Sequence, residues 1–288
     1  MQYELKKQLK QTAAFWMLRI FTFIVLAILF VILGFIVQKG IRVISWDFIT
    51  KMPEDGMTKG GIFPAIVGTL LLVLGSMIIA FPVGVMSGIY MNEYIKDGWF
   101  KRFMNVMTNN LAGIPSIVFG LFGMEFFVNE LKWGDSILAG SFTLGLLALP
   151  VVIRVTEEAL KAVPNNFREA SMALGATKLQ TTYKVVLPIG MPNIVTGLIL
   201  SLSRVSGETA PILFTVAAYF LPKLPSSWHD QVMALPYHLY VLATSGTNIE
   251  ESRPMAYGTA LVLIIIVLIF NLTANALRKF LSKKVKMN

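Results

Sequence analysis

The segment PNNFREASMALGATKLQTTYKVVLP, residues 164–188, predicts a helical hairpin between two long apolar runs. Pro164 suits the first turn of a helix, where its missing N–H costs no hydrogen bond. Gly175 suits the left-handed conformation that ends many helices. Thr177 and Gln180 have the spacing of a capping box, which begins a second helix. We therefore expect a helix, a sharp turn and another helix that runs to the closing proline.

Each helix of this hairpin carries apolar side chains on one face. At helical spacing they are Ala170, Ala173 and Leu174 in the first helix, and Leu179, Tyr183 and Val186 in the second. Such a face either packs on the membrane domain of its own chain or binds a partner protein. Periodicity alone leaves both alternatives open.

The composition indicates a membrane protein. Of the 288 residues, 55% are hydrophobic and only 14% are charged, and the mean hydropathy of +0.68 is far above that of a water-soluble domain. The net charge of +9 does not indicate nucleic acid binding, because the basic residues flank apolar runs instead of forming a stripe on a soluble fold.

Metal and thiol chemistry are not expected. The chain has no cysteine, which excludes disulfides, Cys-based zinc or iron–sulfur sites and a thiol nucleophile. The two histidines, His229 and His238, have no neighbouring carboxylates at ligand spacing, whereas zinc usually takes three or four ligands. We interpret both as structural.

Six apolar stretches reach, or nearly reach, the length of about 20 residues that a membrane-spanning helix needs. They are residues 15–38, 62–91, 104–128, 136–156, 193–220 and 255–277. A further apolar piece, residues 233–243, is too short to span, so we expect it in the interface or re-entrant, and we predict no seventh helix. The predicted fold class is an all-α integral membrane protein with six transmembrane helices.

The distribution of basic residues predicts a multi-pass protein with both termini in the cytoplasm. With the N-terminus inside, sixteen of the 25 Lys and Arg residues lie on the cytoplasmic side and seven outside, in agreement with the positive-inside rule. Lys6, Lys7 and Lys10 before the first stretch also resemble the start of a signal peptide. However, residues 20–37 are too long for a signal-peptide core and no small-residue cleavage site follows, so we expect a retained anchor.

Charges within the predicted spans mark candidate functional residues, because an ionisable group at mid-bilayer costs from about 2.5 to more than 10 kcal/mol. Arg204 and Glu208 lie near the middle of 193–220 and one turn apart, so they share a face and can pair. They form either a self-neutralising structural pair or a pathway site, in which the guanidinium binds a tetrahedral oxyanion and Glu208 prevents its trapping. Ser206 and Thr209 could add hydroxyl donors, although bonding to the helix backbone is their commoner use.

Two more charges are ambiguous. Arg154 follows an uncharged run, and it either belongs to the pathway or extends to the cytoplasmic headgroups. Glu125, near the outer end of the third stretch, is expected to cap the interface or pair with a neighbouring helix, outside the site. No nucleophile, base and orienting residue occur together at an aqueous face, so we predict no catalytic residues and no enzyme activity.

The hairpin resembles the EAA loop of bacterial ABC import permeases, the element that docks into a groove on the ATPase subunit. The matching residues are Glu169-Ala170-Ser171, Gly175 and Val185-Val186-Leu187-Pro188 at the family's spacing. Ser171 stands where the family has its second alanine and Val185 where it has an isoleucine, which are small departures. The resemblance implies that Glu169, Ala170, Ser171, Gly175, Leu187 and Pro188 serve in coupling to the ATPase.

The wider match covers residues 62–277. It includes Thr69-Leu70-Leu71, Pro82-Val83-Gly84 and Tyr90-Met91-Asn92-Glu93-Tyr94. It implies a type I ABC importer permease fold, with ATP and Mg²⁺ bound by a separate ATPase subunit and no cofactor in this chain. The absence of a G-x-x-x-x-G-K-[ST] phosphate loop agrees with this implication.

The expected organisation has three parts. Residues 1–61 comprise a cytoplasmic tail, the anchor helix and an external loop. Residues 62–278 form the permease core, with the EAA coupling loop at 157–188. Residues 279–288 are a basic cytoplasmic tail.

A narrower resemblance concerns the charged span. Arg204-Val205-Ser206-Gly207-Glu208-Thr209-Ala210-Pro211 and Asn110-Leu111-Ala112-Gly113-Ile114-Pro115-Ser116-Ile117-Val118 are similar to the PstA-type permeases of bacterial phosphate ABC importers. This resemblance implies that Arg204 and Arg154 are important for phosphate passage across the prokaryotic inner membrane. It also implies a PstC-type permease partner, two PstB-type ATPase subunits and a PstS-type binding protein.

Other functions remain as alternatives. The same machine could move another oxyanion or solute, because the coupling loop carries no information about the cargo. An ion-gradient secondary transporter or channel could also use an Arg–Glu pair, but we see no two related halves with broken helices at matching positions. A membrane enzyme is the weakest alternative.

Overall fold

The computed structural model describes residues 2–245 and 249–287. Residues 1 and 288 of the two predicted tails, and the side chains of Lys6, Lys284 and Lys286, lie outside the described part. In chain order the elements are α1 (Gln2–Gly40), α2 (Trp46–Thr50), β1 (Pro53–Glu54), the 3₁₀ turn η1 (Asp55–Met57), β2 (Lys59–Gly60), α3 (Phe63–Ile89), the π-helix η2 (Tyr90–Tyr94), α4 (Trp99–Gly113), α5 (Ser116–Gly123), the π-helix η3 (Met124–Glu130), α6 (Ile137–Lys161), α7 (Asn165–Ala173), α8 (Lys178–Thr181), the π-helix η4 (Thr182–Val186), α9 (Leu187–Ser206), α10 (Ala210–Leu213), α11 (Leu235–Thr244) and α12 (Ile249–Met287).

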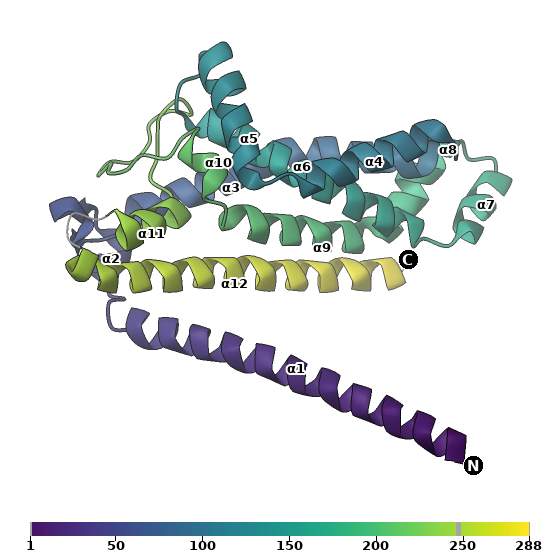
Figure 1. The fold of residues 1–288 in the computed structure, drawn as a ribbon. Helices are drawn as coiled ribbons and strands as arrows, with labels where there is room; N and C mark the ends of the chain where they lie inside the picture. Colours follow the sequence, from purple (N-terminus) through teal and green to yellow (C-terminus); the bar gives the residue numbers. More distant parts are fainter. Residues whose placement is uncertain (1, 246–248, 288) are drawn as a thin grey trace.

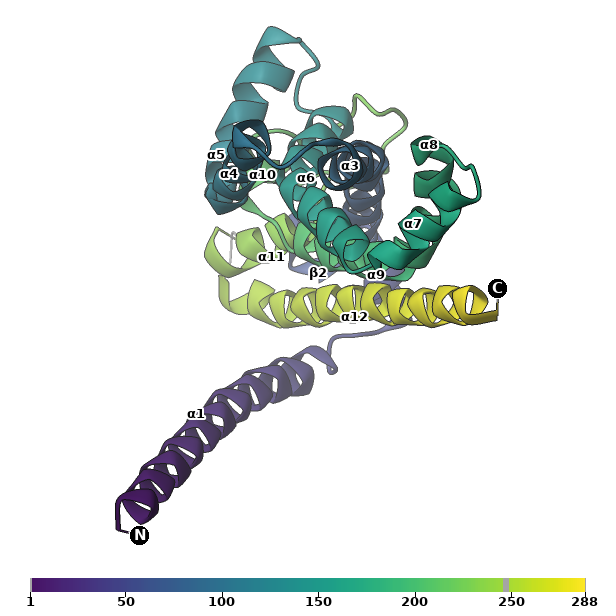
Figure 2. The same cartoon turned by 90° about the vertical axis from the view of Figure 1, so that its right-hand side faces the viewer.

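Helices α3, α6 and α9 form the body of the protein. Helix α3 packs on α6, α6 on α9, and α9 on α12 (Figures 1 and 2). Strands β1 and β2 form a short antiparallel ribbon before α3. Helix α1 contacts α12 near its C-terminal end, where the Phe35 and Tyr257 rings are 5.5 Å apart. The rest of α1 diverges from the bundle and exposes its apolar side chains, as a membrane anchor does.

Four predicted spans are confirmed. Helix α1 contains the stretch 15–38, and α12 contains 255–277. Helix α3 with η2 corresponds to 62–91, and α6 corresponds to 136–156. Among the described residues, five helices are long and apolar enough to cross a membrane, and the bent pair formed by α4 and α5 brings the number to six. The prolines inside α3 and α6 are tolerated, as expected of membrane helices.

The predicted span over 104–128 consists of two helices with a sharp bend between them. Helix α4 ends at Gly113, and the segment from Ser116 to Glu130 leaves at 94° to it (Figure 1). The cause is Pro115, which has no N–H for the helix and disfavours helical backbone at the preceding residue. Accordingly Ile114 is extended, with φ −70° and ψ 133°.

The predicted span 193–220 is wrong at both ends. Pro188 lies in the first turn of α9, so the helix continues through it instead of starting after the loop. At the other end α9 stops at Ser206, where the N–H of Gly207 bonds the carbonyl of Arg204 at 3.2 Å and closes the last turn. The chain then forms only the four-residue helix α10. The charged pair therefore lies at a helix end.

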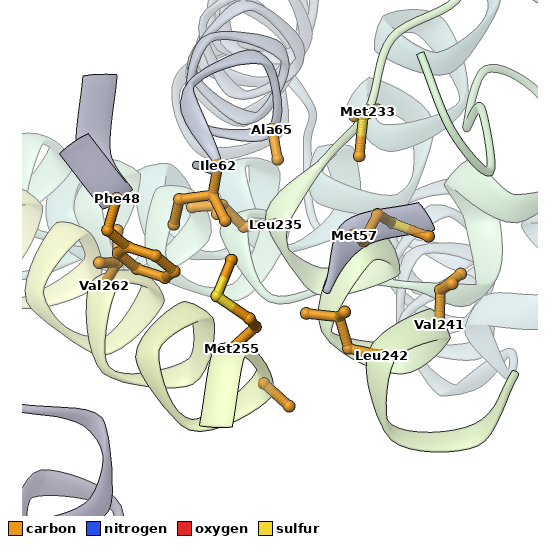
Figure 3. Close-up of a cluster of buried hydrophobic side chains, with 11 residues drawn as sticks. Phe48, Met57, Ile62, Ala65, Met233, Leu235, Val241, Leu242, Met255 and Val262 are labelled. Atoms are coloured by element: carbon orange, nitrogen blue, oxygen red, sulfur yellow. The ribbon is translucent and has the colours of Figure 1, made fainter. Parts of the chain in front are cut away.

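A hydrophobic cluster fills the end of the bundle opposite the α7–α8 hairpin. It joins α2, α11 and the first turns of α3 and α12, and Figure 3 shows Phe48, Ile62 and Met255 converging there. The apolar piece 233–243 contributes through α11, whose Leu235 and Leu242 are fully buried. Because α11 has only ten residues, no seventh span exists in the described chain, as predicted.

Helices α6 and α9 approach closely at Gly197, which predicts a large effect of a small substitution. A methyl group at Gly197 would overlap the side chain of Val155 on α6. We expect Gly197→Ala to separate these helices and to destabilise the purified protein by about 1–3 kcal/mol, the usual cost of overpacking. Gly34→Ala is the control, because nothing lies within 4 Å of a methyl group there. Equal thermal unfolding temperatures of the two variants in detergent would contradict this packing.

Candidate functional site

Arg204 and Glu208 form the predicted pair. Arg204 occupies the last turn of α9 and Glu208 follows the helix end, with 3.6 Å between Arg204 Nε and Glu208 Oε1. The C-terminal end of a helix carries partial negative charge, which favours a guanidinium there. The side chain of Glu208 is 17% exposed, whereas that of Arg204 is 44% exposed. The pair therefore has a buried carboxylate side and an open guanidinium side.

The pair lies deep in the bundle. Glu208 lines a small cavity of about 10 Å³ with Thr69 and Leu72 of α3 and Leu144 of α6. These three residues lie roughly 9–14 Å from the starts of their helices, at 1.5 Å per residue. A guanidinium facing lipid at such a depth is strongly unfavourable. The exposed side of Arg204 must therefore face a partner subunit or a water-filled path.

The two predicted hydroxyl donors differ in where they point. Ser206 is 1% exposed, and its Oγ donates to the carbonyl of Leu202 at 2.7 Å. Thr209 is half-buried and directly precedes α10; its hydroxyl has no hydrogen bond to any other described residue. Of the two, Thr209 is the available donor beside the Arg204–Glu208 pair.

Arg154 lies elsewhere, on α6, and donates a hydrogen bond from Nη2 to Oδ1 of Asn109 on α4. Asn109 lines an open polar cavity of about 430 Å³ between α4 and α6, with Asn105, Arg102 and Lys161 among the other lining residues. Arg154 therefore bonds to a residue in the wall of a polar cavity and does not extend freely toward headgroups. Arg154 and Arg204 therefore have different partners, Asn109 and Glu208.

The charges of this cavity partly cancel. Lys101 Nζ is 2.9 Å from Oδ1 of Asp97, and this hydrogen bond holds the pKa of the Asp97 carboxyl below its ordinary value. Arg102 and Lys161 then face the single carboxylate of Glu157, which leaves a small positive excess. These residues were not predicted as a site, although Asn105 and Asn109 stand four residues apart and so share one face of a helix. Glu125, placed outside the site, accepts a hydrogen bond from Asn129.

The helical hairpin forms as predicted. Gly175 turns between α7 and α8 with φ +83°, and the capping box is complete, with Thr177 N to Gln180 Oε1 at 2.9 Å and Gln180 N to Thr177 Oγ1 at 3.2 Å. The hydroxyls of Ser171 and Thr181 are 2.9 Å apart and join the two arms. Ser171, the departure from the family's second alanine, thus adds a cross-link.

The apolar face of the hairpin is open. Leu174 at its tip is 90% exposed and Leu179 is 58% exposed. The other large apolar side chains that are exposed in the hairpin are Phe167, Met172 and Tyr183, whereas Val186 is buried. The hairpin therefore does not bury this face on its own membrane domain, which favours the alternative that a partner covers it. Of the other predicted coupling residues, Glu169, Ala170 and Pro188 are exposed and Leu187 is half-buried.

One pair near the hairpin was missed by the sequence analysis. Arg168 was counted only as a positive residue of the loop, but it forms a bidentate ion pair with Glu93, 75 positions earlier. No local spacing rule connects residues that far apart in the chain.

The fold is that of ABC transporter permease chains. A chain of the inward-facing MetNI methionine ABC transporter superposes with a TM-score of 0.60 at 21% identity, covering 77% of this chain and 94% of that one. A chain of the bacterial alginate ABC transporter, solved with its alginate-bound periplasmic protein, gives a TM-score of 0.68 at 16% identity, covering 96% and 98%.

Sequence comparisons assign the family. The family described as binding-protein-dependent transport system inner membrane component matches residues 80–287. The probable ABC transporter permease protein YqgI of Bacillus subtilis is 35% identical over 92% of this chain and 94% of its own length. The phosphate transport system permease proteins PstA 1 of Mycobacterium tuberculosis and PstA of Haemophilus influenzae are 40% and 33% identical, over 79% and 84% of this chain and 73% and 84% of their own lengths. The chain thus belongs to the family of binding-protein-dependent transport inner membrane components, and it is a multi-pass permease subunit with no enzymatic activity of its own.

Proposed function

We propose that this chain forms half of the translocation pathway of an ATP-driven phosphate importer. The observation that carries the proposal is the deep Arg204–Glu208 pair with its guanidinium open on one side. A planar guanidinium binds tetrahedral oxyanions through two parallel hydrogen bonds, and Thr209 adds a hydroxyl. The adjacent Glu208 weakens anion binding enough for release, as transport requires. The relatives named as phosphate transport permeases support phosphate as the cargo.

The exposed side of Arg204 is assigned to the interface with a second permease subunit of the PstC type. The pathway then lies between two permeases, and the polar cavity that Arg154 borders forms its cytoplasmic part. The other proposed partners are two PstB-type ATPase subunits, which bind ATP and Mg²⁺, and a PstS-type phosphate-binding protein outside.

The hairpin is proposed to dock on the ATPase. Its exposed apolar tip suits a groove on a partner, and the predicted coupling residues Glu169, Ala170, Ser171, Gly175, Leu187 and Pro188 belong to it or to the following turn. Along the bundle, both described chain ends lie toward the hairpin (Figure 1). Because the ATPase is intracellular, this arrangement supports cytoplasmic termini, in agreement with the distribution of Lys and Arg.

The cargo is tested with the whole complex. We expect phosphate, delivered by the binding protein, to stimulate ATP hydrolysis and uptake by the purified and reconstituted complex more than sulfate or molybdate does. An equal or larger response to another oxyanion would overturn the phosphate assignment while leaving the permease fold intact.

A further inference from the structure

The coupling hairpin is fastened to the bundle by one buried ion pair. Arg168 on α7 donates from Nε to Glu93 Oε2 at 3.1 Å and from Nη2 to Glu93 Oε1 at 2.6 Å. Glu93 belongs to η2, the π-helical segment that ends α3. The side chains are 15% and 6% exposed, respectively. Parallel, buried, charge-assisted bonds of this kind fix geometry more strongly than exposed pairs do.

The same guanidinium also holds the end of α6. Its Nη1 donates to the carbonyl of Val163 at 2.7 Å, and its Nη2 donates to the carbonyl of Leu160 at 2.9 Å. Leu160 lies in the last turn of α6, and its carbonyl also accepts the backbone N–H of Val163 at 3.1 Å. Arg168 therefore joins three elements, α7, η2 and α6, at one point.

The second arm of the hairpin reaches the same segment. Lys178, the first residue of α8, places its Nζ 5.3 Å from the centre of the Tyr94 ring in η2, within the range of a cation–π contact. Both arms thus converge on η2. In contrast, the tip of the hairpin around Leu174 stays open to a partner.

The fastened helices are those that surround the deep charged pair. Thr69 and Leu72 of α3 and Leu144 of α6 line the small cavity beside Glu208. A displacement of the hairpin that keeps its ion pair must therefore move α3 and α6, and with them the walls around Glu208. If the pair is broken, α9 remains as the continuous helical connection from α8, through η4.

We propose that Glu93 and Arg168 are positioning residues that transmit movement of the docked ATPase to α3 and α6. They contact neither cargo nor nucleotide. The inference rests on the proposed docking of the hairpin and adds the route by which that docking acts. It assigns to the pair a role in the number of cargo molecules moved per ATP.

The test measures uptake and ATP hydrolysis together in reconstituted complexes with the oxyanion that stimulates the wild type. We expect Glu93→Gln and Arg168→Lys to assemble and hydrolyse ATP, but to transport roughly 5- to 150-fold less per ATP, the usual range of coupling between sites. The charge-reversed double variant Glu93→Arg/Arg168→Glu can form the ion pair again, so it should recover part of the transport per ATP. The control is Asp47→Asn, which breaks an exposed ion pair at 2.6 Å outside the hairpin and should keep the wild-type ratio.

A covalent link gives an independent readout, because the chain has no cysteine of its own. In a complex whose other subunits lack cysteine, Glu93→Cys/Arg168→Cys should be uncoupled when reduced and should recover coupling when a short bifunctional thiol reagent joins the two positions. The proposal would be overturned if both single variants transported as much cargo per ATP as the wild type. It would also be overturned if no variant assembled, because the pair would then be a purely structural contact. A wild-type complex that imports another oxyanion would refute phosphate as cargo and leave this test valid.

Discussion

Uptake is expected to fall by about 100-fold or more in Arg204→Gln, with the complex still assembled. The variant removes the charged donor, and loss of a charged hydrogen bond costs about 1.5–3 kcal/mol, while each 1.4 kcal/mol is a factor of ten. It also leaves Glu208, only 17% exposed, without its partner. An unpaired carboxylate in the path repels the anion, so the two effects add.

Uptake of labelled phosphate into proteoliposomes measures this effect, and co-purification of the other subunits verifies assembly. Arg42→Gln is the control, because Arg42 is an exposed arginine just after the anchor helix. The double variant Arg204→Gln/Glu208→Gln separates the two effects. It should remain at least tenfold below wild type if the guanidinium binds the anion. Recovery of uptake in the double variant, or normal uptake in Arg204→Gln, would make the pair structural.

Leu174→Glu is expected to weaken association with the ATPase by about 30-fold or more. Leu174 is 90% exposed, so the substitution leaves the permease fold unchanged. An apolar side chain at the centre of an interface can contribute 2 kcal/mol or more, and burial of an unpaired carboxylate in its place adds a further cost. Gly175 next to it keeps its positive φ, so the hairpin retains its shape.

Association is measured by titrating the detergent-purified permease pair with the ATPase subunit. Trp46→Ser is the control, because Trp46 is also a large apolar residue, 79% exposed, and lies in α2 at the opposite end of the protein. Equal ATPase affinity for Leu174→Glu and wild type would show that the hairpin tip is not the docking surface.

The fold follows from the sequence where one physical rule dominates. Hydrophobic length places four of the spans, and the preferences of Gly175 and of Thr177 with Gln180 produce the hairpin. The errors arise where rules compete. At Pro115 the two helical segments meet at an angle of 94°. In contrast, Pro188 occupies the first turn of α9, and the helix continues through it. The residue before Pro115 is extended, whereas the π-helix η4 runs directly into α9 at Pro188.

The candidate site was predictable only as far as local spacing allows. The contact between Arg204 and Glu208 follows from their four-residue separation. The contacts of Arg168 with Glu93 and of Arg154 with Asn109 join positions 75 and 45 residues apart, so they depend on how the helices pack. For Ser206, the commoner use expected of such a hydroxyl is confirmed, because its Oγ donates to the carbonyl of Leu202 in its own helix.

We expect this permease to move an oxyanion only when an ATPase docks on its hairpin. The most direct test compares phosphate uptake into proteoliposomes that contain both permease subunits and the binding protein, with and without the ATPase and ATP. We expect uptake against a gradient only with the ATPase and hydrolysable ATP, and none with the Leu174→Glu permease at ATPase concentrations that saturate the wild type. Concentrative uptake driven by an ion gradient without the ATPase would contradict ATP-driven import and indicate a secondary transporter.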